Sequence, residues 1–65
     1  MNEKVRAAIC FHIRTLTGQG LSANEIAEHI NAVLPHSNHG HDWNAGSICK
    51  FARRAKITVP NDSAN

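Results

Sequence analysis

Imidazole and thiolate groups are the side chains of this sequence with the broadest chemistry, because both bind transition metals. Five histidines and two cysteines carry them: His12, His29, His36, His39, His41, Cys10 and Cys49. Three of the histidines lie within residues 36–41, yet their spacing matches no zinc finger or ribbon, and the cysteines form no CxxC pair. A metal site assembled from these groups is the rival interpretation. We expect no metal, no cofactor and free thiols.

Catalytic chemistry has little support in the sequence. Its serine, histidine and aspartate residues show no arrangement typical of nucleophilic catalysis. It also contains no evident pair of carboxylates and no glycine-rich loop that could bind phosphate. A chain of 65 residues and 7.1 kDa forms one small core, so a substrate pocket of the usual ~300–1,000 Å³ is not expected. We therefore predict no enzyme, no catalytic residue and no small-molecule substrate.

Basic residues gather near the C-terminal end, although the formal net charge is only +2. Up to Asp42, carboxylates outnumber the lysines and arginines. Beyond it, only Asp62 opposes a basic cluster formed by Lys50, Arg53, Arg54 and Lys56. Such a concentration is typical of a surface that binds a polyanion. The same cations would also suit a solvated helix face, and this plainer interpretation stays open.

Three amphipathic helices are predicted to position these side chains. They run from about Glu3 to Leu16 after the cap Asn2, from the cap Ser22 to the residue before Pro35, and from the cap Asn44 to about Lys56. Their apolar stripes are Val5, Ile9, His12, Ile13 and Leu16; then Ile26, Ala27, Ile30, Val33 and Leu34; then Ile48, Phe51, Ala52 and Ala55.

The resulting fold class is all-α, a three-helix bundle in which residues 1–58 form the domain and residues 59–65 a flexible tail. Ser22 and Glu25 form a predicted capping box. Residues 35–42 lack periodicity and form a loop. His12 lies within an apolar stripe, where a hydrogen-bonded core histidine is the expected role.

The outer face of the third predicted helix could enter a DNA major groove, which is about 12 Å wide and admits one helix. Gly46, Lys50 and Arg53 lie opposite its apolar stripe, flanked by Ser47, Cys49 and Arg54. We predict base-edge contacts from Asn44, Ser47, Lys50 and Arg53. Phosphate contacts are predicted from Arg54 and Lys56, with His39 or His41 as further candidates.

The sequence also resembles a known class of DNA-binding motif. Residues Gly20–Ala27, then Ile30-Asn31, then Trp43–Ile48 with Phe51 and Arg53, are similar to the helix-turn-helix of serine recombinases and related trihelical regulators. The resemblance spans Gly20 to Arg54 and implies a bracing first helix and a recognition helix that begins at Asn44. The connection from Pro35 to Trp43 exceeds the usual turn of about 3–4 residues, so the crossing angle is left open. No recombinase catalytic domain is present, so strand cleavage is not implied.

The predicted function is therefore binding of double-stranded DNA, in transcriptional regulation or as a mobile-element accessory factor. The alternative is a helical protein-interaction module with no DNA affinity, because Phe11 falls outside the apolar stripe and is expected to be exposed. A homodimer contact is expected at Phe11, if the domain dimerises. No membrane-spanning segment or secretion signal is apparent, so a cytoplasmic location is expected.

Overall fold

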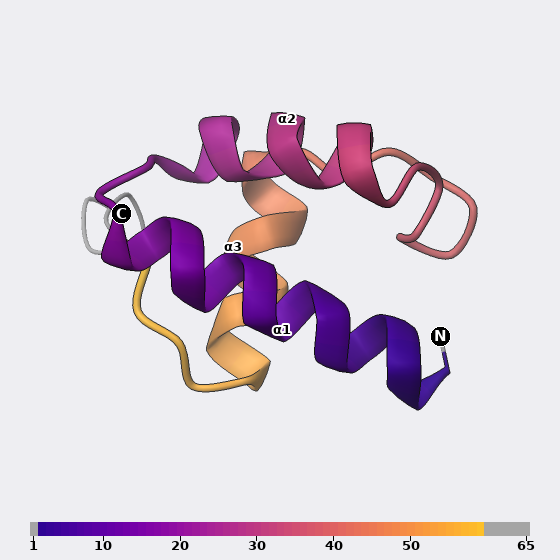
Figure 1. The fold of residues 1–65 in the computed structure, drawn as a ribbon, viewed down its shortest axis with the longest axis horizontal. Helices are drawn as coiled ribbons and strands as arrows, with labels where there is room; N and C mark the ends of the chain where they lie inside the picture. The colour runs from indigo at the N-terminus through magenta and orange to yellow at the C-terminus, as the bar shows by residue number, and fades with distance from the viewer. Residues whose placement is uncertain (1, 60–65) are drawn as a thin grey trace.

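Three helices make up the architecture of this protein in a computed structural model, which describes residues 2–59. They are α1 (Glu3–Gly18), α2 (Ala23–Val33) and α3 (Ala45–Arg54). The chain returns above α1 as α2, and after a long connection α3 descends across both (Figure 1). The described residues contain no strand beyond one isolated bridge between Asn38 and His41. The predicted all-α three-helix bundle is confirmed.

The helices begin where the sequence predicts, because local side chains satisfy their first N–H groups. The Val5 N–H donates to Asn2 Oδ1 over 2.9 Å. At α2, the Ser22 N–H donates to Glu25 Oε1 over 3.0 Å, and the Glu25 N–H donates to Ser22 Oγ over 3.3 Å. The hydrogen bond from the Ser22 backbone, followed by the one from its side chain, lowers the pKa of the Glu25 carboxyl. The predicted capping box is therefore confirmed.

The helix ends differ slightly from the prediction. Helix α1 continues to Gly18, two residues past Leu16, whereas α3 ends at Arg54 rather than near Lys56. Lys56 has a φ of 59°, which is left-handed, so it cannot continue a right-handed helix. Helix boundaries commonly move by this much, since the last turn of a helix lacks intrahelical partners.

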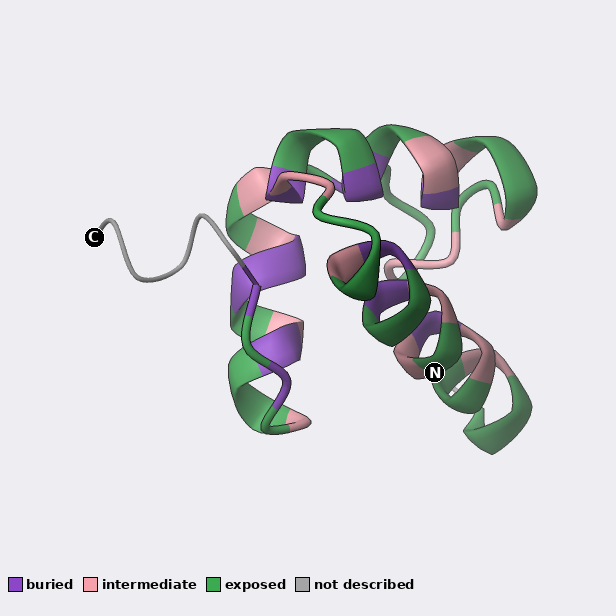
Figure 2. Ribbon diagram, turned by 60° about the vertical axis from the view of Figure 1, so that its left-hand side comes forward, coloured by how far each residue is buried: buried purple, intermediate pink, exposed green. Residues whose placement is uncertain are grey.

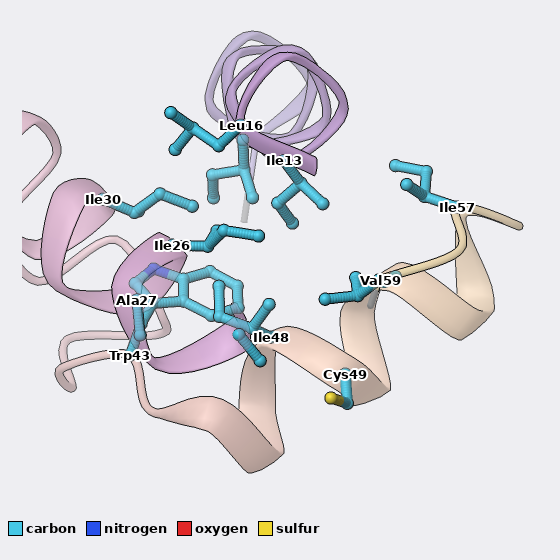
Figure 3. Close-up of a cluster of buried hydrophobic side chains, with 13 residues drawn as sticks. Ile13, Leu16, Ile26, Ala27, Ile30, Trp43, Ile48, Cys49, Ile57 and Val59 are labelled. Atoms are coloured by element: carbon cyan, nitrogen blue, oxygen red, sulfur yellow. The ribbon is translucent and has the colours of Figure 1, made fainter. Parts of the chain in front are cut away.

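The hydrophobic core lies where the inner faces of the three helices meet. Figure 2 shows the buried positions on these faces and the exposed ones outside. Isoleucines supply most of the fully buried large side chains, and Trp43 closes one end of the cluster (Figure 3). The core residues are Ile9, Ile13, Leu16, Ala23, Ile26, Ala27, Ile30, Trp43, Ile48, Cys49, Ala52, Ile57 and Val59.

Burial departs from the predicted stripes at three positions. Val33 was predicted inside but is 46% exposed, because the last turn of α2 reaches an open hollow beside Val5 and the loop. Cys49 was predicted on the outer flank of α3 but is buried. Val59 was placed in the predicted tail, yet it is fully buried and, with Ile57, joins the core cluster that contains Cys49. The buried side of α3 is wider than its apolar stripe because this returning segment packs into the same core. The rest of the predicted tail, residues 60–65, lies outside the described residues.

Candidate nucleic-acid interface

A reciprocal capping box occupies the first turn of α3. The Asn44 N–H donates to Ser47 Oγ over 2.9 Å, and the Ser47 N–H donates to Asn44 Oδ1 over 2.9 Å. The Ser47 hydroxyl also donates to the Asn44 carbonyl over 3.0 Å. Two of the side chains predicted to contact base edges therefore have oxygens engaged in holding the helix start. The Asn44 amide nitrogen has no hydrogen bond within the described part of the chain.

The outer face of α3 is small near its start and basic near its end. Gly46, Lys50, Arg53 and Arg54 are exposed along it, and Lys56 is exposed just beyond. A Cβ on Gly46 would lie 3.3 Å from Asn44 Oδ1, so glycine at this position also leaves room for the cap. Within residues 2–59, neither Lys50 nor Arg54 has an ion pair or hydrogen bond through its side chain. The positive charges of these two side chains remain available to a ligand.

One side of this basic face borders an open hollow of about 530 Å³ between α1, the connection and α3. Its walls are formed by residues from all three segments: Arg6, Asn38, His39, Trp43, Ser47, Lys50, Phe51 and Arg54. No acidic side chain of the described residues lines it. The structure thus joins a third cation, Arg6 of α1, to Lys50 and Arg54. A hollow of this volume also differs from the sequence-based expectation that none would form, because the loop between α2 and α3 supplies a wall that helix patterns do not show.

Arg6 is the site residue that sequence reasoning missed. It lies far from Lys50 along the chain, and its placement depends on how α1 packs across α3. No local spacing carries that information. The only sequence signal is that Arg6 is one of the few cations in the otherwise acidic first part of the chain.

The connection between α2 and α3 is held in shape by hydrogen bonds to Trp43. The Trp43 N–H donates to Asn31 Oδ1 over 2.7 Å, and Asn31 Nδ2 donates to the Trp43 carbonyl over 2.9 Å. The Trp43 indole Nε1 donates to Ser37 Oγ over 2.7 Å. Its ring meets Phe51 edge-on, with ring centroids 5.6 Å apart. The connection therefore forms a fixed wall of the hollow.

The five histidines lie in different surroundings, and only one of them lines the hollow. His39 and His41 are both exposed, but only His39 lines the hollow. His36 Nδ1 lies 3.9 Å from Asp42 Oδ1 on the surface. His12 and His29 are half-buried, with ring centroids 5.4 Å apart. Both cysteines are free. In the part of the chain that the structure describes, no three potential ligands from histidine, cysteine, aspartate and glutamate gather at one point.

Comparison with known proteins gives no relative for this chain. No family model matches it, and no curated protein or solved structure does so either. The helix-turn-helix resemblance therefore stays a prediction from the residues that carry it. Among residues 2–59 there is also no helix with the length and apolar character needed to cross a bilayer.

Proposed function

We propose that this protein binds duplex DNA, with the outer face of α3 directed into the major groove. The observation that carries the proposal is the segregation of side chains on α3. Its buried face consists of Ile48, Cys49 and Ala52, whereas its exposed face carries Lys50 and Arg54 without an opposing carboxylate on the helix. A helix with one apolar, anchored face and one basic, exposed face suits the groove and its flanking phosphates.

The roles follow from the position of each residue along α3. Asn44 and Ser47 stand at the leading end, where Gly46 permits close approach of the backbone. Because their oxygens hold the cap, base discrimination depends mainly on Lys50 and Arg53. Arg54 and Lys56 are proposed to contact phosphates, together with His39 from the adjoining wall; His41 is a second candidate. The biological setting is regulation of transcription or of a mobile element.

Salt-dependent binding to duplex DNA tests the proposal. Each phosphate contact releases counterions, so the logarithm of affinity falls linearly with the logarithm of salt concentration. Arg54→Gln removes a proposed phosphate contact, so it should weaken binding and reduce the slope by about one. Lys50→Gln removes a proposed base contact, so it should weaken binding with a smaller change in the slope. In a selection from a random duplex pool, Lys50→Gln should also relax base preference, whereas Arg54→Gln should weaken all sequences alike.

Lys4→Gln is the matched control, because Lys4 is an exposed lysine of α1 that lines none of the hollow. It should leave the slope close to that of the parent protein. The proposal is wrong if the parent has no duplex affinity at low salt. It is also wrong if Lys4→Gln, Lys50→Gln and Arg54→Gln weaken binding equally.

A second candidate function is favoured by Phe11, which is 66% exposed on α1. It borders a shallow apolar surface with Ala7, Cys10, Arg14 and Thr15. An exposed aromatic in such a position is typical of a protein contact. A protein-interaction module would show no duplex affinity in the titration above, and Phe11→Ser would abolish self-association measured by sedimentation if the partner is a second copy.

A further inference from the structure

We infer that the hollow between α1, the connection and α3 binds an unpaired nucleotide, with its phosphate at Arg6, Lys50 and Arg54 and its base against Phe51. This site shares Lys50 and Arg54 with the proposed duplex surface, but it does not require duplex binding. The ligand class is a nucleoside monophosphate, either free or as a residue of a single strand.

The charge around the hollow selects an anion. Three cationic side chains from two helices surround it, and no acidic side chain among the described residues opposes them. Glu25 and Glu28, the carboxylates of α2, do not line it. Two guanidinium groups are suited to phosphate because each offers paired N–H donors in one plane.

The size of the hollow and its uncharged lining residues favour a ligand that is larger than inorganic phosphate and carries a base. Its volume of about 530 Å³ lies within the usual ~300–1,000 Å³ range of small-molecule sites, and inorganic phosphate would leave most of it unfilled. Phe51 offers an aromatic surface, and bases stack on such rings irrespective of their sequence. Asn38 lines the same space, and its side-chain amide has no hydrogen bond within residues 2–59. A primary amide supplies both a donor and an acceptor for the edge of a base.

The aromatic wall is positioned before any ligand arrives. Trp43 is held by Asn31 at both its N–H and carbonyl and by Ser37 at its indole nitrogen. Its ring packs edge-to-face against Phe51, at an interplanar angle of 83°. Little ordering of this wall is then required on binding, and such preorganisation favours affinity.

Titration followed by NMR tests the site directly. Trp43 is the only tryptophan of the sequence, so its indole N–H gives a single signal in the wall of the hollow. Deoxyadenosine 5′-monophosphate should shift this signal and the amide signals of Asn38, Lys50 and Arg54. Deoxyadenosine lacks the phosphate and inorganic phosphate lacks the base, so each should bind more weakly than the monophosphate. A short single strand of deoxyadenylates shows whether the nucleotide is preferred free or within a chain.

Arg6→Gln should weaken binding of the monophosphate about fivefold, the size expected of one exposed charge contact. Arg14→Gln is the matched control, because Arg14 lies on the same helix but lines a different hollow. Phe51→Leu should lower affinity for the monophosphate while leaving affinity for inorganic phosphate unchanged, and the dispersion of its NMR spectrum shows whether it is folded.

The inference is overturned if the monophosphate shifts no signal around the hollow, if phosphate alone binds as tightly, or if Arg6→Gln and Arg14→Gln behave alike. A parent protein that binds duplex DNA but no monophosphate would disprove this inference and leave the proposed function standing. Monophosphate binding without duplex affinity would do the reverse.

Discussion

At the scale of single residues, α1 and α3 end in the same hydrogen-bonded turn, with a different amino acid at its left-handed position. After α1, Gly20 has a φ of 84°, and the N–H groups of Gly20 and Leu21 donate to Thr17 and Leu16 carbonyls over 3.0 and 3.1 Å. After α3, Lys56 has a φ of 59°. Its N–H and that of Ile57 donate to the carbonyls of Arg53 and Ala52 over 3.2 and 2.8 Å. Both are Schellman motifs, in which glycine is favoured at the left-handed position.

Lys56→Gly should therefore stabilise the protein. A side chain in the left-handed region costs roughly 1–2 kcal/mol, partly offset by the greater freedom of glycine in the unfolded chain. We expect a gain of about 0.5–1 kcal/mol in the free energy of unfolding, measured by urea denaturation. Lys56→Ala, which removes the charge but keeps the Cβ, should give no such gain. Equal stability of the two variants would show that backbone strain at this position is negligible.

At the scale of elements, one side chain of α2 is hydrogen-bonded to the residue that precedes the α3 cap. Asn31 of α2 satisfies both backbone polar groups of Trp43, the residue that immediately precedes the α3 cap. Trp43 is only 4% exposed, so its backbone groups would have little access to water without Asn31. The connection from Leu34 to Asn44 is long, but hydrogen bonds attach its end at Trp43 to Asn31 of α2. These bonds restrict its conformation.

Asn31→Ala should destabilise the fold by about 2–3 kcal/mol, because it leaves a backbone donor and a backbone acceptor unpaired in a part-buried site. Urea denaturation measures the change. Asn24→Ala makes the same chemical change at an exposed position of α2 and should alter stability by less than about 0.5 kcal/mol. Similar losses in the two variants would mean that the Asn31 contact does not hold the elements together.

At the scale of the whole molecule, the core includes a segment beyond the three helices. Ile57 and Val59 follow α3 and fold back into the cluster that joins all helices (Figure 3). A small domain buries a limited share of its surface, so two extra apolar side chains are a substantial addition. The core therefore includes Val59, a residue that the sequence pattern had assigned to the tail.

Val59→Ala should lower the free energy of unfolding by about 1.5–3 kcal/mol, from two lost methyl groups and the space they leave. Val33→Ala is the matched control, since Val33 is 46% exposed and alanine favours the helix it occupies. It should change stability by less than about 0.5 kcal/mol. Thermal unfolding followed by circular dichroism compares them, and equal effects would show that the returning segment adds nothing to the core.

The helix starts and most buried positions were predictable because their causes are local. Asn2, Ser22 and Asn44 bond to N–H groups three residues ahead, a distance that the sequence displays directly. Likewise Ile9, Ile13, Ile26, Ile30 and Ile48 repeat at the helical period and are fully buried. The outward placement of Lys50, Arg53 and Arg54 follows from the same period once the inner face of α3 is known.

The remaining features join residues that lie far apart in the chain. Arg6 lines the hollow together with Lys50 and Arg54. Asn31 accepts a hydrogen bond from the Trp43 N–H, and Val59 packs into the core that contains the buried face of α3. By itself, the sequence determined the three helices, their caps and the basic outer face of the last one, since neighbouring residues are enough to specify each. Only the tertiary structure decided which cations share one space and what walls surround it, because packing between helices, rather than spacing along the chain, sets those distances.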